Sequence, residues 1–406
     1  MPELVDHPVW KVPSLEDAGR LAALLSRESG ASVSVQQAWE RLESARRKRI
    51  ADALERPLTH GWEPSIWWIA DALLGMDWVL PPWLPKDFGP RVRRLLLGRN
   101  RPLRVLQING GNRSGKTTYT CKRALQCAMH FERATLWDFH TDSDMSVTAK
   151  QNVYWSFIPP EYKPKRQLKT DSAYLAFKEM TGFAESRFIL PGTASRVEFR
   201  NYRQEKDKIE GGELGAKCPV KRTDELFEEC LGYVTSEHVP ADWIETLGLR
   251  LATRGARGIV EFTPTNGYSP AVKLFQQGMT VVRWTPAWLL PVAKVEPAVA
   301  RQMQIEDCAR WIEDLPAEPA AAQFEQVPRV AVCANKEWGV LWMHSSDNPF
   351  GNPAGVWGEI VTKHTAFKRE RFYGVADKEQ AGAFPLFNEA VHVSAHAPRF
   401  EIEDAA

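Results

Sequence analysis

The fold is decided by one stretch, residues 105–125, which reads VLQINGGNRSGKTTYTCKRAL. An apolar, β-prone run ends in two glycines, and a Gly-Lys-Thr triplet then opens a segment with helical character. The spacing Gly110-x-x-x-x-Gly115-Lys116-Thr117 is typical of a loop that binds phosphates. In such a loop the glycines let backbone N–H groups point at a phosphate, and the helix that follows directs its positive end there.

The whole loop is expected to contact the nucleotide. Lys116 would reach the β- and γ-phosphates of ATP, and Thr117 would hold Mg²⁺ through its hydroxyl. A chance glycine turn is the alternative, and the strand before the loop and the helix after it argue against that alternative. The expected nucleotide-binding residues are Gly110, Gly111, Asn112, Arg113, Ser114, Gly115, Lys116, Thr117 and Thr118.

Composition bounds the other possibilities. The 406 residues are 44% hydrophobic and 25% charged, as in ordinary globular proteins, and the formal net charge is +1. Recruitment of nucleic acid or of a membrane surface must therefore depend on local patches. The six cysteines form no CxxC pair, so neither a zinc site nor a disulfide framework is indicated. No apolar run approaches the roughly 20 residues of a membrane span, and the N-terminus does not resemble a signal peptide.

The chain changes character near Leu103. Residues 1–60 show helical apolar spacing, and a stretch rich in Trp and Pro follows, which we interpret as a short helix with an aromatic packing face. From Leu103 onwards, short apolar strands alternate with helices, which predicts an α/β fold with a mainly parallel sheet covered on both faces. Strands are expected at 103–108, 134–139, 195–202, 231–237, 257–264, 279–286 and 329–346, and helices at 116–131, 146–162 and 241–255.

A hydrolase also needs a carboxylate that activates water. The segment CLGYVTSEHVP (230–240) is an apolar strand that ends at Ser236 and Glu237, and Glu237 is the candidate general base. An Asp normally precedes this Glu and supports Mg²⁺ through water, but here Ser236 takes that place and is the candidate metal-site residue. A surface Glu at a strand end is the alternative interpretation.

The segment GIVEFTPTNGYS (258–269) is the next feature. Its strand delivers Thr263, Pro264 and Asn266 at its carboxyl end, and in a parallel sheet such ends line the nucleotide crevice. Thr263 and Asn266 are residue types that can sense a phosphate or a positioned water. A plain Pro/Gly turn is the alternative.

Together, these segments resemble the ATPase half of the large terminase subunit of tailed, double-stranded DNA phages. Four pieces occur in the family's order over roughly residues 60–395. They are GGNRSGKT (110–117), TSEHVP (235–240), FTPTNG (262–267), and SSDNPFGN (345–352) followed by RERFYGVADKEQAGAFPLF (369–387). The third is similar to the coupling motif that links hydrolysis to DNA movement, and the fourth is similar to the segment that closes the ATPase domain.

The resemblance implies a P-loop NTPase core of the RecA-like (ASCE) type, with an N-terminal helical segment or lid at 1–100, the core at 101–290, and the C-terminal part of the ATPase domain at 291–406. It implies ATP and Mg²⁺ as cofactors and a homo-oligomeric ring that translocates double-stranded DNA into a procapsid in the host cytoplasm. The implied partners are the portal protein and the small terminase subunit. The family's RNase H-like nuclease would begin where this sequence ends. We therefore expect no DNA cleavage by this chain, with the nuclease either removed or encoded separately.

Several alternatives stay open at this stage. An arginine should stabilise the developing phosphate charge, either Arg113 in cis or Arg250 or Arg254 in trans. DNA contact should be electrostatic and independent of sequence, through the basic loops 162–169 and 217–222 or equally through other surfaces.

Ser236 leaves the strength of hydrolysis open. With Ser236 in place of Asp, either the metal is held weakly and Ser236→Asp would lower the Mg²⁺ requirement, or another carboxylate such as Asp138 serves the metal. The competing function is a nucleotide-binding structural subunit of a packaging complex, with weakened or no hydrolysis. An unrelated P-loop helicase is less favoured, because motifs of a second RecA-like domain are not evident.

Overall fold

The computed structural model describes residues 13–60, 63–82, 84–163, 169–202, 212–217, 226–236, 238–263, 269–276, 280–282, 329–348 and 369–376. Its strands are β1 (Val105–Gly110), β2 (Thr135–His140), β3 (Lys169–Thr170), β4 (Ala173–Tyr174), β5 (Phe177–Lys178), β6 (Gly182–Phe183), β7 (Arg187–Ile189), β8 (Arg196–Asn201), β9 (Leu231–Thr235), β10 (Arg257–Phe262), β11 (Thr280–Val282), β12 (Val330–Val332) and β13 (Trp338–Met343).

The described helices are α1 (Leu15–Ser29), α2 (Val35–Glu55), α3 (Pro57–His60), α4 (Ser65–Leu74), α5 (Phe88–Leu97), α6 (Lys116–His130), α7 (Ser143–Ser146), α8 (Asn152–Phe157), α9 (Ala241–Ala252) and α10 (Pro270–Gln276). Short 3₁₀ or π turns are η3 (Asp77–Val79), η4 (Val147–Gln151), η5 (Pro160–Tyr162), η6 (Ala184–Ser186), η9 (Ser345–Asp347) and η10 (Arg369–Tyr373). Among the described helices, none has both the length and the apolar character needed to cross a bilayer.

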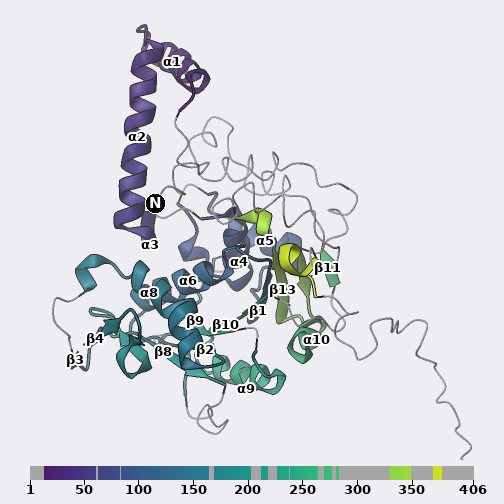
Figure 1. The fold of residues 1–406 in the computed structure, drawn as a ribbon. Helices are drawn as coiled ribbons and strands as arrows, with labels where there is room; N and C mark the ends of the chain where they lie inside the picture. The colour runs from purple at the N-terminus through teal and green to yellow at the C-terminus, as the bar shows by residue number, and fades with distance from the viewer. Residues whose placement is uncertain are drawn as a thin grey trace, which may run out of the picture.

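One large sheet organises the molecule, with the strand order β11-β12-β13-β1-β10-β9-β2-β8-β7-β4-β3 (Figure 1). The six strands from β13 to β8 pair in parallel, and the strands at both edges pair antiparallel. The predicted α/β class with a mainly parallel sheet is confirmed. The antiparallel extension through β7, β4 and β3 and the small β5–β6 hairpin were not predicted, because these strands are only two or three residues long.

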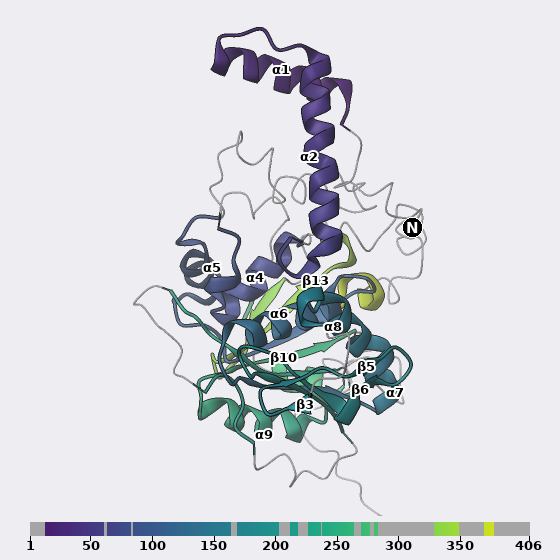
Figure 2. The same ribbon diagram turned by 90° about the vertical axis from the view of Figure 1, so that its left-hand side faces the viewer.

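Helices cover both faces of the parallel region (Figure 2). On β1, Leu106 and Ile108 point into an apolar cluster that includes side chains of α4, α5 and α6. Val105, on the opposite face, joins a second cluster that includes side chains of α9 and α10. This alternation places α6, the helix that follows the phosphate loop, on the same face of the sheet as Ile108.

The two N-terminal helices follow the expected pattern closely. Ser14 caps α1, with the Asp17 N–H donating to Ser14 Oγ at 3.1 Å and the Ser14 N–H donating to Asp17 Oδ2 at 3.2 Å. Helices α1 and α2 pack on each other through a small apolar contact and extend away from the body of the molecule (Figures 1 and 2). The Trp-rich stretch forms α4, where Trp67 and Trp68 are buried as expected for a packing face.

The helix predicted at 146–162 is divided. It consists of α7, the π-helical turn η4 and α8, and its helical course ends at Phe157, before the proline pair. The π-helical turn carries Lys150, whose side chain reaches Asp138 on β2. Residues 164–168 and 218–222 of the two predicted basic loops lie outside the described residues.

Candidate nucleotide-binding site

The predicted phosphate-binding segment, residues 110–117 and called here the phosphate loop, connects β1 to α6 at the carboxyl end of the central strand. Gly115 immediately precedes α6 and has φ +85°, a left-handed conformation that glycine adopts without steric cost. A Cβ at this position would lie 3.2 Å from side-chain atoms of both Trp67 and Asn348. Within the described residues, no side chain caps the start of α6, so its first N–H groups face the loop. These are the features that a phosphate-binding loop requires.

Two segments distant in sequence hold this loop in place. The Asn112 N–H donates to the Arg371 carbonyl at 2.5 Å, and Ser345 Oγ donates to the Asn112 carbonyl at 2.6 Å. Asn348 Nδ2 donates to the Arg113 carbonyl at 2.7 Å. Both segments belong to the stretches that the motif resemblance singled out near the end of the ATPase domain.

At Gly374, the second of these segments lies very close to the backbone of β1. Its φ is +68°, and a Cβ there would lie 2.9 Å from backbone atoms of Asn109 and Gly110. Backbone atoms of β1 cannot yield to a side chain, so this position requires glycine. The segment that follows η10 therefore packs directly against the root of the phosphate loop.

Lys116 and Thr263 come together at the centre of the site. Lys116 Nζ donates to Thr263 Oγ1 at 2.6 Å, although the two residues were predicted from separate motifs. Thr263 is buried and directly follows β10, the parallel neighbour of β1. Pro264 and Asn266, the other predicted coupling residues, lie outside the described residues.

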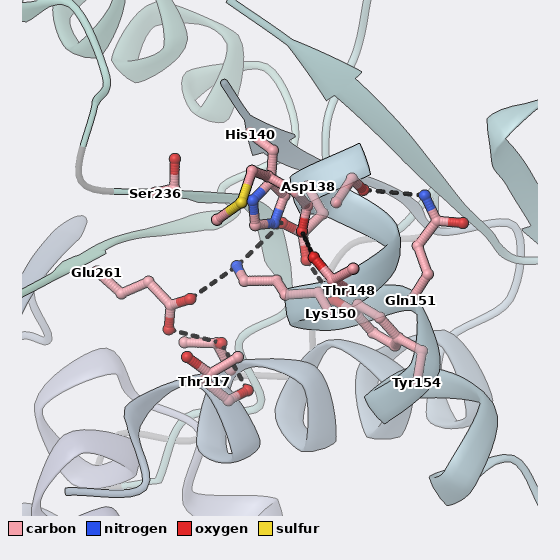
Figure 3. Close-up of polar contacts among 12 residues, drawn as sticks. Thr117, Asp138, His140, Thr148, Lys150, Gln151, Tyr154, Ser236 and Glu261 are labelled. Carbon is pink, nitrogen blue, oxygen red and sulfur yellow. Dashed lines mark hydrogen bonds and ion pairs between the residues drawn. The ribbon is translucent and has the colours of Figure 1, made fainter. Parts of the chain in front are cut away.

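The segment 230–240, whose strand end was predicted to carry the general base, lies only partly within the described residues. Glu237 lies outside the described residues, so its role as general base stays a prediction. The Ser236 N–H donates to the Tyr202 hydroxyl at 2.8 Å, and Ser236 Oγ lies 3.2 Å from the same hydroxyl. In Figure 3 the Ser236 hydroxyl points away from Thr117. The structure thus gives Ser236 a partner in Tyr202, and its metal role remains untested.

The candidate arginines occupy different regions. Arg113 lies in the loop, is exposed, and has φ +60°. Arg250 and Arg254 lie near the end of α9, which runs back from the carboxyl end of β9 to the start of β10. They therefore lie near the amino ends of the parallel strands, whereas the phosphate loop lies at the carboxyl ends. The Arg254 guanidinium pairs with Glu213 Oε2, at 2.5 Å from its terminal nitrogen. Of the three candidates, only Arg113 lies in the phosphate loop, and its role in cis stays a prediction.

A buried group of charges lies beside the loop helix, formed by Asp138, Lys150 and Glu261, and is called here the acid–lysine cluster (Figure 3). Lys150 Nζ lies 3.0 Å from Asp138 Oδ1 and 2.8 Å from Glu261 Oε1. The Tyr154 hydroxyl donates to Asp138 Oδ2 at 2.8 Å, and His140 Nε2 lies 3.5 Å from Asp138 Oδ1. All five side chains are buried, so these interactions act in a medium of low dielectric constant.

Ionisation of the acid–lysine cluster is fixed by its mutual contacts. Burial disfavours the charged form of Asp138, but the Lys150 ammonium and the His140 contact outweigh it and lower the Asp138 pKa. Burial likewise opposes the charge on Lys150, yet the carboxylates of Asp138 and Glu261 raise the pKa of Lys150 well above its ordinary value. Lys150 is therefore an ammonium at neutral pH and Asp138 a carboxylate.

Glu261 connects this cluster to the loop helix. Thr120 Oγ1 donates to Glu261 Oε2 at 2.8 Å and lies 3.1 Å from the Thr117 carbonyl. Glu261 and Lys150 were not among the predicted site residues. The available signal was an acidic residue inside the apolar run GIVEF, because a buried strand rarely carries a carboxylate without a partner.

A second buried network fixes α6 against α4. The Arg123 guanidinium pairs with Asp71 at 2.7 Å and with Glu63 at 2.7 Å, and the Tyr119 hydroxyl donates to Asp71 at 3.0 Å. Arg123 and Asp71 are fully buried. Several charge-assisted hydrogen bonds therefore hold α6 in a single position relative to α4.

The residues present fit a nucleoside triphosphate with its divalent ion. The open start of α6 and the Lys116 ammonium can neutralise phosphates, and Thr117, in the first turn of α6, carries the hydroxyl type that ligates Mg²⁺. The buried carboxylate of Glu261 lies close behind that turn.

Comparison with known proteins finds no matching family model and no matching curated protein. Among solved structures, the large terminase ATPase domain of Thermus phage P74-26 matches with 11% identity and a TM-score of 0.35, over 68% of this chain and 90% of that domain. The large terminase of the thermophilic bacteriophage D6E, solved in complex with ADP, matches with 9% identity and a TM-score of 0.36. That match covers 72% of this chain and 53% of the D6E chain. One of these neighbours is a large terminase ATPase domain and the other a large terminase, the family that the motifs resemble.

Proposed function

We propose that this chain is the ATP-hydrolysing motor of a terminase large subunit, which moves double-stranded DNA into a viral procapsid. The observation that carries the proposal is the meeting of Lys116 with Thr263. It joins the phosphate loop of β1 to the expected coupling segment of β10. The strand of the expected general base, β9, lies next to β10 in the same parallel sheet. The strands that lead into these three motifs are parallel neighbours, so they end on the same side of the sheet.

In this proposal each predicted site residue has a physical task. The N–H groups at the start of α6 and the Lys116 ammonium bind the phosphates, and Thr117 binds the metal. Mg²⁺, when bound, neutralises phosphate charge. Glu237 takes the proton of the attacking water, and Arg113 supplies positive charge from the same chain. Arg250 or Arg254 would act only on the site of a neighbouring subunit.

Thr263 would report the occupancy of the site. Its hydroxyl accepts a hydrogen bond from Lys116, and phosphates that share the ammonium weaken this bond. The end of β10 would then respond to binding and release of nucleotide. This provides a direct connection from the phosphates to the residues that follow Thr263, which the resemblance assigns to coupling.

The remaining parts of the proposal concern partners and location. The motor would form a homo-oligomeric ring with the portal protein and the small terminase subunit in the cytoplasm of an infected bacterium. DNA contact would be independent of sequence, through basic segments such as 162–169 and 217–222. Nuclease activity is not part of the proposed function of this chain.

Measuring ATP turnover with and without double-stranded DNA tests the proposal. A motor hydrolyses ATP, and DNA stimulates its turnover. The alternative, a nucleotide-binding structural subunit, is favoured by Ser236, whose hydroxyl lies against Tyr202 and not against Thr117. Tight ATP binding without turnover, in the presence and absence of DNA, would support that alternative.

A further inference from the structure

The strand register places an acidic residue beside the position where the expected Asp is missing. Val260 of β10 pairs with Thr235 of β9, so Glu261 and Ser236 follow at the same level of neighbouring strands. On its other side, Glu261 pairs with Ile108 of β1. An acid at position 261 is therefore one strand closer to the phosphate loop than an acid at position 236.

The contacts of Glu261 direct its carboxylate at the first turn of α6. One oxygen accepts from Thr120 Oγ1 at 2.8 Å, and this hydroxyl lies 3.1 Å from the Thr117 carbonyl. The other oxygen lies 2.8 Å from Lys150 Nζ. Figure 3 shows the Glu261 side chain between Lys150 and the turn that carries Thr117. Residue Glu261 is only 4% exposed, and its carboxylate is held by contacts on two sides.

The acid–lysine cluster carries one more negative charge than positive charge, so a cation nearby would stabilise it. Asp138 and Glu261 contribute two negative charges, and Lys150 contributes one positive charge. A surplus negative charge in a buried site is costly unless a positive partner lies near. A divalent ion at Thr117 would be such a partner, and Lys150 would keep the carboxylate from turning away.

We propose that Glu261 supplies the outer-sphere carboxylate of the Mg²⁺ site, acting through metal-bound water, and that Lys150 and Thr120 position it. The acid is thus displaced from β9 to β10, and Ser236 is free to contact Tyr202. This inference rests on the proposed nucleotide site. Glu261 is a metal-positioning residue here, and Glu237 keeps its proposed role as general base.

The test measures nucleotide affinity, not turnover. Binding of a fluorescent, non-hydrolysable ATP analogue is titrated by fluorescence in EDTA and over a series of Mg²⁺ concentrations. Loss of an outer-sphere partner typically costs ~10–100-fold in metal affinity. Glu261→Gln should therefore raise the Mg²⁺ concentration for half-maximal enhancement of binding ~10–100-fold. Its affinity in EDTA should stay within about threefold of wild type, because the amide keeps the hydrogen bond from Thr120.

Glu229→Gln is the matched control. Glu229 is also a fully buried glutamate, paired with Arg257 at 2.6 Å, but it lies near the start of β10, at the opposite edge of the sheet. It should leave the Mg²⁺ dependence unchanged. If Glu261→Gln does not fold, Glu261→Asp takes its place. It keeps the charge and withdraws the carboxylate by one methylene, so the Mg²⁺ requirement should rise there too.

Two outcomes overturn the inference while the proposed function survives. One is a wild-type Mg²⁺ dependence in Glu261→Gln or, where that variant does not fold, in Glu261→Asp. The other is a raised Mg²⁺ requirement in Asp138→Asn together with a wild-type requirement in Glu261→Gln, which would assign the role to Asp138. Failure of the wild-type chain to bind the analogue under any condition would instead refute both the nucleotide site and this inference.

Discussion

Replacing Lys150 with Met tests the energetics of the acid–lysine cluster. The substitution keeps a long side chain in the buried space but removes the ammonium that lies 3.0 Å from Asp138 and 2.8 Å from Glu261. Both carboxylates then face each other without their shared cation. Removing one partner of a buried ion pair costs about 3–5 kcal/mol, because the remaining charge is left uncompensated.

This cost translates into a measurable change of the melting temperature. Unfolding entropy is about 2.1 cal/mol/K per residue, or roughly 0.85 kcal/mol/K for the 406-residue chain, so Lys150→Met should lower the Tm by roughly 4–6 °C at pH 7. Differential scanning calorimetry measures this shift. Lys169→Met is the matched control, because Lys169 Nζ also lies 3.0 Å from a carboxylate, that of Glu185, but is exposed. An exposed pair contributes little, so the control should melt close to wild type.

The shift should depend on pH with a definite sign. In the wild type the Asp138 pKa is lowered, so its contribution to stability is present above the ordinary Asp pKa of about 3.9 and is lost only as the pH falls below it. The pKa of Lys150 is raised, so its contribution persists until the pH rises beyond the ordinary Lys value of about 10.4. The ion pair between Asp138 and Lys150 therefore stays intact in the wild type between pH 5 and pH 9.

The variant should behave differently over this range. Without the ammonium that lowers its pKa, and with the Glu261 carboxylate still nearby, Asp138 should have a higher pKa in the variant than in the wild type. The folded variant then binds protons on acidification that the unfolded chain does not bind, and it regains stability. The Tm difference from wild type should be smaller at pH 5 than at pH 7. A Tm shift no larger than that of Lys169→Met, or a difference that widens at pH 5, would refute this reasoning.

Four further predictions concern the nucleotide site. Lys116→Ala should abolish ATP binding or turnover, measured by fluorescence titration and phosphate release, because it removes the charge that the loop directs at the phosphates; undiminished ATPase activity would contradict the nucleotide site. Glu237→Gln should bind ATP but not hydrolyse it, since an amide cannot take a proton from water, and wild-type turnover would assign the base to another residue. Thr263→Val keeps the shape but removes the acceptor for Lys116, so it should retain ATP binding while DNA-stimulated turnover falls; unchanged stimulation would exclude Thr263 from coupling. Introduced into the wild type, Ser236→Asp should not lower the Mg²⁺ requirement, whereas introduced into Glu261→Gln it should restore the wild-type requirement. A lowered Mg²⁺ requirement in the single variant Ser236→Asp would instead support the weak-metal interpretation of Ser236.

Sequence alone was sufficient where the signal lies in neighbouring residues. The phosphate loop is a short contiguous pattern, because one turn of backbone and the first turn of one helix create the anion site. The helical spacing within residues 1–60, which appears in the structure as α1 and α2, is equally local. Alternation of apolar strands with helices also predicted the parallel sheet, because both faces of such a sheet must be covered.

Tertiary structure decided which of these pieces meet. Glu261 lies in a strand and Lys150 in a π-helical turn, and nothing in the residues between them encodes their contact. Their pairing depends on strand order and register, which place β10 between β1 and β9, and a shift by one residue would turn Glu261 to the other face. The same holds for Gly374 against the backbone of β1. Local spacing specifies the elements, whereas burial of the complete core fixes the long-range contacts that complete the site.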